Sequence, residues 1–406
     1  MSKRAWSALT VFFVPLLAQA ADEPQWLKDA RAREGKPGKA VSIQSKDKWF
    51  SATVPAKLVG TIEKVDGSYT VELNIGSEQP VYCEVVPDSF DLADMTRRTL
   101  ELTLEEVGKA QGKIEARRLE ETDAGVFGSV PYLQAQWVYR VNDGKSAMVG
   151  GYKQITMEKN GQGIYCSHVD IGYNKSFVAL AKAFAETFKS ASDKPAPYYE
   201  EIAVTTINGK RMSIARSTLE RDEDGDTKVT DSMASLIPGP SGEFHSQDAT
   251  RLEWVRPDNS LINATRIVVE DGELTTNLNL QVVDDYWTVE GDHGGKKVSE
   301  KLKTDAQPGT WLAQASGIRK ILAADNPVGT EHKMWYWLGG DPVKLTETKA
   351  RVTAKAGDKR FKGVATLEGI DADVIIDATS GTIVNADVNT KGMAMTFERV
   401  YARGAL

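Results

Sequence analysis

The side chains with the clearest chemical potential are two cysteines, Cys83 and Cys166. His168 follows Cys166 by two positions, and in a strand this spacing places both side chains on one face, as a thiol nucleophile and its base would require. In an exported chain, however, an even pair of cysteines is typical of one disulfide. We therefore expect a structural Cys83–Cys166 disulfide rather than a catalytic thiol.

The remaining reactive residues form no catalytic or metal-binding motif. The four histidines, at positions 168, 245, 293 and 332, include no His-x-x-x-His or His-Glu-x-x-His pair. Neither a Gly-x-Ser-x-Gly nucleophile motif nor a phosphate-binding Gly-x-x-x-x-Gly-Lys-Ser/Thr loop is present. We expect no catalytic residue, no metal ligand and no cofactor, and therefore a protein that is not an enzyme.

Two acidic groups keep alternatives open. Residues 222–226 offer close carboxylates that would suit calcium, but they lack the glycine and glutamate of the established loop, so a solvated hairpin tip is favoured. Asp284, Asp285 and Asp341 are candidates for the paired acids of a glycoside hydrolase. Their separation in space does not follow from the sequence.

The first twenty residues have the layout of a cleaved signal peptide. Lys3 and Arg4 precede a short apolar run, Ala5–Leu17, and Ala18-Gln19-Ala20 is a small-x-small cleavage site. The run is too short to span a bilayer, and no cysteine follows the site to carry a lipid. We expect a periplasmic protein, exported and released without a lipid anchor.

Composition indicates an ordinary globular protein of two domains. The 406 residues are 41% hydrophobic and 26% charged, and the formal net charge of −7 comes from mixed charges rather than blocks. A chain of this kind has no basic surface for nucleic acid, and no apolar run after residue 20 is long enough to cross a membrane. We expect it not to span a membrane.

The pattern along the chain predicts the domain boundaries. A flexible N-terminal arm at 21–45 precedes an α+β domain at 46–190, a Pro- and Ser-bearing linker at 191–200 and a β-rich domain at 201–406. Helical spacing of apolar residues predicts helices at 90–107 and 175–190 in the first domain. Alternation predicts its strands at 50–54, 58–62, 69–75, 81–86, 114–119, 132–141, 147–158 and 164–169.

The second domain reads as an antiparallel meander interrupted by one helix. Thr310 is the predicted cap of that helix, which runs over 311–324 and ends before Pro327. A sheet of many strands with a single helix is expected to curl around the apolar face of that helix. Strands are predicted at 202–207, 210–220, 227–237, 244–256, 261–270, 274–283, 286–290, 296–303, 332–338, 344–356, 361–367, 372–377, 383–390 and 393–401.

The order of these segments resembles a known family pattern. Lys210–Ser217 follows an Asn-Gly turn, and Gly317–Ala323 precedes a Trp-rich strand and a long strand at 343–353. This resembles the β-rich domain that precedes the transglutaminase-like core in bacterial envelope proteins, which is similar to the LolA/LolB-type half-barrel. Over residues 202–406 the resemblance implies a curved antiparallel sheet clasping a helix. The Cys-His-Asp core is missing here, so no catalytic residue carries over.

The first domain resembles the PsbP-like fold in the order of its elements. A strand ending at Pro87-Asp88 is followed by a helix, paired strands and a C-terminal helix. The expected fold class is therefore α+β: an N-terminal α+β sandwich followed by a curved antiparallel half-barrel sheet clasping one helix. Both resemblances imply non-catalytic binding or assembly at membranes or envelopes.

Aromatic and aliphatic residues of the second domain are candidates for a ligand groove. A packed core is the alternative explanation for the same residues. We expect a non-catalytic periplasmic binding or scaffold protein of the cell envelope, which holds a lipid, another apolar ligand or an envelope protein in the half-barrel cleft. The alternatives are a hydrolase with an unrecognised active site and a pure protein-interaction module. The groove candidates are Trp287, Trp311, Ile318, Leu322, Trp335 and Trp337.

Overall fold

The computed structural model describes residues 24–36, 38–88, 90–239, 243–304, 306–390 and 393–406. The predicted signal peptide at 1–20 lies outside these residues. The chain forms two compact units. The boundary between them lies between Ala196 and Pro197, inside the segment predicted as a linker. The first unit holds the described chain up to Ala196 together with Ser235–Ser246, and the second holds Pro197–Ala234 and Gln247–Leu406.

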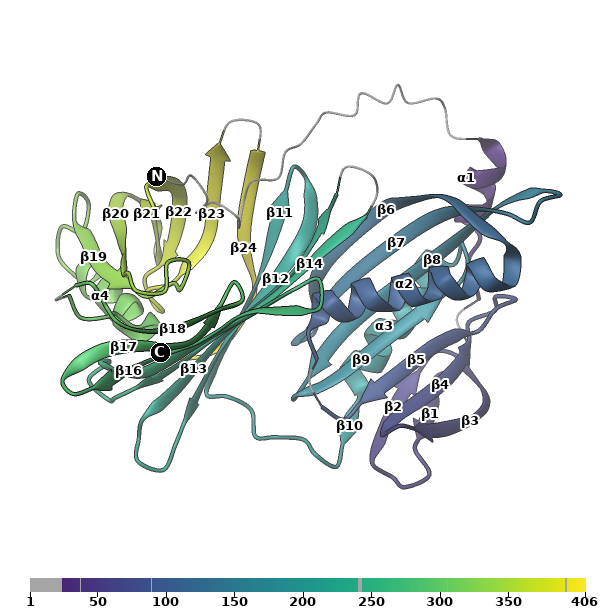
Figure 1. The fold of residues 1–406 in the computed structure, drawn as a ribbon, viewed down its shortest axis with the longest axis horizontal. Coiled ribbons are helices and arrows are strands. Elements are labelled where there is room, and N and C mark those ends of the chain that lie inside the picture. The colour runs from purple at the N-terminus through teal and green to yellow at the C-terminus, as the bar shows by residue number, and fades with distance from the viewer. Residues whose placement is uncertain (1–23, 37, 89, 240–242, 305, 391–392) are drawn as a thin grey trace. The chain divides into compact units, whose positions relative to one another are not determined.

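Among its described residues, the first unit contains two antiparallel sheets and three helices (Figure 1). A small sheet has the order β1-β2-β10, and a seven-stranded sheet has the order β3-β4-β5-β9-β8-β7-β6. The elements are α1 (Gln25–Ala32), β1 (Val41–Gln44), β2 (Phe50–Val54), β3 (Lys57–Val65), β4 (Ser68–Asn74), β5 (Val81–Val86), α2 (Leu92–Gln111), β6 (Lys113–Phe127), β7 (Val130–Asn142), β8 (Ala147–Lys159), β9 (Gln162–His168), α3 (Asn174–Thr187) and β10 (Lys189–Ser190).

The two long helices pack against opposite faces of the seven-stranded sheet. The hydroxyl of Thr96 on α2 lies 2.8 Å from that of Thr156 on β8, whereas Ile155, the preceding residue of β8, packs in the core with Phe184 of α3. Successive side chains of a strand point to opposite faces, so α2 and α3 cover different sides of β8. The aromatic spacing of α3 therefore serves core packing.

The described residues of the N-terminal arm contact the first unit at two places. β1 pairs with β2 along its whole length. The carboxylate of Glu34 accepts hydrogen bonds from the backbone N–H groups of Lys175 (2.9 Å) and Ser176 (3.0 Å) at the start of α3. A carboxylate at a helix N-terminus satisfies donors that have no partner inside the helix.

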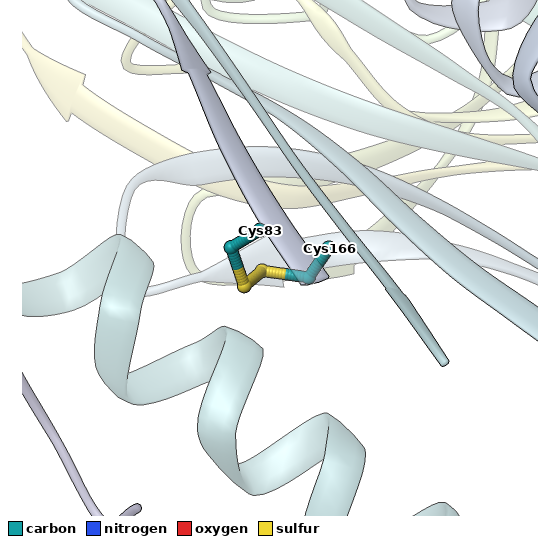
Figure 2. The surroundings of a disulfide bond; sticks show 2 residues. All are labelled: Cys83 and Cys166. Atoms are coloured by element: carbon teal, nitrogen blue, oxygen red, sulfur yellow. A yellow bond between two sulfur atoms is a disulfide. The ribbon is translucent and has the colours of Figure 1, made fainter. Parts of the chain in front are cut away.

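The predicted disulfide is present. Cys83 on β5 stands directly opposite Cys166 on β9, with their Cα atoms 4.0 Å apart, and both cysteines are buried in the core beneath α3 (Figure 2). The thiol of Cys166 is therefore consumed, which excludes its use as a nucleophile beside His168. A disulfide between adjacent strands is consistent with an oxidising compartment.

Among the described residues, the second unit holds one helix, α4, and a fourteen-stranded antiparallel sheet, apart from the strand residues within Ser235–Ser246 that belong to the first unit (Figure 1). Its strand order is β18-β17-β16-β15-β14-β13-β12-β11-β24-β23-β22-β21-β20-β19. The elements are β11 (Tyr199–Ile207), β12 (Lys210–Arg221), β13 (Thr227–Pro238), β14 (Phe244–Val255), β15 (Leu261–Glu270), β16 (Glu273–Val283), β17 (Tyr286–His293), β18 (Lys296–Lys301), α4 (Trp311–Leu322), β19 (Glu331–Tyr336), β20 (Thr346–Gly357), β21 (Arg360–Leu367), β22 (Ile370–Asp377), β23 (Ile383–Thr390) and β24 (Met393–Gly404).

The sheet of the second unit bends around α4. At one end of the helix Trp311 packs with the cluster that contains Tyr199 and Val255, and at the other end Leu322 packs with Val352 of β20. Trp337, just beyond edge strand β19, is buried against β15, β16 and β17 near the other edge. Contacts between segments that are so distant in the strand order require a strongly curved sheet.

The fold class is β-rich rather than the α+β class expected, with 57% of the described residues in strands and 14% in helices. The N-terminal α+β sandwich is not clearly formed, because long antiparallel strands dominate that unit as well. Each predicted strand overlaps an observed one, while the short strands β1 and β10 escape prediction. None of the described helices has the length and apolarity needed to cross a membrane.

Candidate ligand-binding site

A cavity of about 390 Å³ lies in the second unit between α4 and the concave face of its sheet. This volume falls in the range of about 300–1,000 Å³ that is usual for small-molecule sites. The wall combines apolar and charged side chains from the sheet and the helix. It is formed by Glu201, Ala215, Ser217, Asp231, Ser232, Met233, Ala249, Thr250, Arg251, Arg266, Trp311, Gln314, Ala315, Ile318, Gly381, Thr382, Ile383 and Phe397.

One wall of the cavity is formed by a single stripe of residues on helix α4. Trp311, Ala315 and Ile318 follow one another at helical spacing and all line the cavity. The helix begins as expected at Thr310, whose hydroxyl accepts a hydrogen bond from the Ala313 N–H at 3.0 Å. Gly381 allows the turn before β23 to approach this helix, since its φ is +72° and a Cβ there would lie 2.1 Å from the Ala315 carbonyl oxygen.

One charged group at the cavity wall is fully engaged in a hydrogen-bonded network. The carboxylate of Glu201 on β11 accepts hydrogen bonds from the Tyr199 hydroxyl (2.7 Å) and the Arg399 guanidinium (3.3 Å). Arg399 also donates to Asp377 at 2.9 Å and to Thr382 at 2.8 Å. Burial nevertheless raises the pKa of Glu201. This network ties β11 to β22, to β24 and to the turn before β23, so we assign it a structural role.

A second charged group centres on Arg251 of β14. Its guanidinium lies 4.0 Å from the centroid of the Tyr336 ring and forms an ion pair with the fully buried Glu253. Burial raises the pKa of Glu253 against the lowering effect of Arg251. Within the described part of the chain, Nε of Arg251 has no hydrogen-bond partner. A buried donor without a partner is costly and is often a ligand contact.

Two more ionisable residues lie beside Arg251. Arg266 on β15 forms no ion pair with any described carboxylate, and burial together with the Arg251 charge lowers its pKa. Asp231 on β13 is held by Ser217, but its Oδ1 atom has no hydrogen-bond partner among the described residues, and burial raises its pKa. The cavity therefore contains polar groups that the protein itself does not satisfy.

The structure brings together only two of the six groove candidates. Trp311 and Ile318 line the cavity, whereas Leu322 is core beneath α4. Trp337 is fully buried in another cluster, with its ring N–H donating to the Pro342 carbonyl at 2.8 Å, and Trp287 packs at the edge of that cluster. Trp335 is 44% exposed. These four residues are not part of the cavity wall.

The charged residues of the cavity were missed by the sequence analysis, although the strand pattern contained a signal. Arg251 and Glu253 occupy every second position of β14 in step with buried Val255. On β15, Arg266 is in step with buried Ala264 and Val268 in the same way. Charged residues in the inward register of a strand are unusual and indicate a polar site within a core. This signal could have been found without the structure.

The acidic alternatives occupy turns. Asp222 accepts hydrogen bonds from the backbone N–H groups of Asp224 (3.1 Å) and Asp226 (2.9 Å) in the β12–β13 turn, as expected for a hairpin tip. Asp284 and Asp285 form the β16–β17 turn, and Asp341 ion-pairs with Lys344. Within the described ranges, no cluster of three or more His, Cys, Asp or Glu residues is placed to hold a metal ion.

Comparisons with known proteins give limited similarity. No family model matches the chain, and no curated protein matches it. A solved β-barrel-like protein of a domain of unknown function, DUF1849, from Brucella abortus is 8% identical over 51% of this chain and 98% of its own, with a TM-score of 0.39. A DUF1089 family protein from Pseudomonas aeruginosa is 12% identical over 49% of this chain and 91% of its own, with a TM-score of 0.25. Neither description mentions LolA/LolB or PsbP, so those resemblances stay predictions.

Proposed function

We propose that the protein is a non-catalytic binding protein whose second unit holds an apolar ligand between α4 and the sheet. The observation that carries the proposal is the cavity of about 390 Å³, with Trp311, Ile318 and Phe397 in its wall. Apolar pockets with a few polar groups are the usual form of small-molecule sites.

The finer form of the proposal is a carrier or scaffold in the bacterial cell envelope, as the LolA/LolB resemblance implies. A single helix lying against a curved antiparallel sheet supports this form. Export to the periplasm is part of the proposal and is supported by the signal pattern at 1–20 and by the Cys83–Cys166 disulfide.

Calorimetric titration with dodecanol, an uncharged apolar probe, tests the binding role. The wild-type protein is expected to bind it saturably. Replacing Trp311 by Ala should weaken binding on the order of tenfold, because a large aromatic contact is removed from the cavity wall. Trp335→Ala is the matched control, since Trp335 lies outside the wall, and it should bind like wild type.

Two results would contradict the proposal. One is the absence of saturable binding by the wild-type protein, and the other is equal weakening by both tryptophan variants. A native mass measurement on protein purified from the periplasm provides an independent check. A co-purifying lipid supports a carrier, and a stoichiometric protein partner supports a scaffold instead.

A further inference from the structure

Two arginines of the cavity wall stand directly opposite each other. In the β14–β15 ladder Arg251 pairs in register with Arg266, and both side chains line the cavity. Directly opposed residues of an antiparallel pair lie on the same face with Cβ atoms about 4.5–5.5 Å apart, where like charges are destabilising. The arrangement therefore has a cost that a bound anion would offset.

Of the two arginines, only Arg251 forms an ion pair with a described carboxylate. Glu253 forms an ion pair with Arg251. Arg266 forms none with the described carboxylates, and burial and the Arg251 charge lower its pKa while the Glu368 charge raises it. Burial raises the pKa of Asp231, against the lowering effects of Ser217 and Arg251. Arg266 thus stands opposite a like charge without an ion pair of its own among the described residues.

From this arrangement we infer that the ligand is a monoanionic amphiphile with a carboxylate head, such as a fatty acid. The inference rests on the proposed function and deepens it. The carboxylate lies between Arg251 and Arg266, and the chain lies along Trp311, Ile318 and Phe397. The planar guanidinium group matches a carboxylate through paired hydrogen bonds. The carboxylate of Glu253, which is paired with Arg251, disfavours a doubly charged phosphate at the same place.

The experiment compares dodecanoate with dodecanol, which share a chain and differ in the head. Wild-type protein should bind dodecanoate more tightly, by on the order of ten- to a hundredfold, because charge-assisted hydrogen bonds are added. Arg266→Gln should remove most of that preference. Its melting temperature should be equal to or above that of wild type, since the like-charge contact with Arg251 is gone.

Arg360→Gln is the matched control, because it removes the same charge from an exposed position of β21 outside the cavity wall. It should retain the dodecanoate preference. Variants of Arg251 are avoided, since they would leave the buried Glu253 without its counter-charge.

Each adverse outcome has a distinct meaning. Equal wild-type affinity for dodecanoate and dodecanol overturns the carboxylate inference but leaves the proposed function intact. Tighter binding of dodecyl phosphate than of dodecanoate overturns the choice of head group. Binding of none of these probes overturns the proposed function as well. A lower melting temperature of Arg266→Gln with unchanged dodecanoate binding would make Arg266 a structural residue.

Discussion

The carboxylate of Glu253 on β14 accepts a hydrogen bond from the backbone N–H of Trp311, the first residue of α4, at 3.0 Å. Glu253 is fully buried and also forms the ion pair with Arg251. One side chain therefore joins the sheet, the start of the helix and the charged end of the cavity. It fixes where α4 begins and so where Trp311 enters the cavity wall.

Replacing Glu253 by Gln should destabilise the protein strongly. The amide keeps an oxygen for the Trp311 N–H, but Arg251 loses its counter-charge inside the core, which typically costs about 3–5 kcal/mol. Urea denaturation measures the change. Glu220→Gln is the control, because Glu220 is exposed and its pairing with Lys228 at 3.9 Å is worth at most about 1 kcal/mol. Similar losses for both variants would argue against a buried counter-charge role.

The disulfide should be a major source of stability for the first unit. It closes a loop over a sequence separation of 83 residues, and restricting the unfolded chain to that extent is worth roughly 4 kcal/mol. A Cys83→Ala/Cys166→Ala double variant should therefore unfold at a clearly lower urea concentration than the oxidised wild type. Wild type treated with reductant should behave like the variant. Coincident curves for oxidised and reduced wild type would contradict the prediction.

Stability should fall between pH 6.5 and about pH 4 because of His168. Burial, assisted by the nearby Lys153 charge and opposed by Asp170, lowers its pKa from 6.5 to about 4. The unfolded chain then binds the proton first as the pH falls. The stabilisation is complete above pH 6.5 and is lost progressively toward pH 4, up to a total of about 3 kcal/mol.

His168→Gln tests this pH dependence, since an amide can still donate to the Gln79 carbonyl that lies 3.2 Å from Nε2 of His168. Denaturation midpoints of the variant should change less between pH 6.5 and pH 4 than those of wild type. The same replacement at exposed His245 controls for the number of histidines. If both variants keep the wild-type profile, other groups cause the acid sensitivity.

Limited proteolysis should cut first between Ser190 and Tyr199. The boundary between the two compact units lies within this segment. Lys194 is exposed there and belongs to no helix or strand. A lysine-specific protease should yield two fragments divided at Lys194, identified by mass on a denaturing gel. An earlier cut at Lys36 or Lys39 would mean that the N-terminal arm opens more readily than the linker does.

The amino-acid sequence by itself determined the local elements. Apolar periodicity and turn residues are properties of neighbouring positions, so the strands, the three longer helices and the Thr310 cap could be predicted from them. The disulfide followed from having only one possible partner for each cysteine. The short strands β1 and β10 escaped because their pairing with β2, not their own pattern, makes them strands.

Only the tertiary structure decided which side chains form the site. Trp311 and Trp337 are the same residue type in neighbouring segments, yet one lines the cavity and the other is core. The opposition of Arg251 and Arg266 depends on the register of β14 against β15, and a shift of one residue would turn one of them away. Register, curvature and the face covered by α4 are set by contacts between distant segments, and a local pattern carries no information about those contacts.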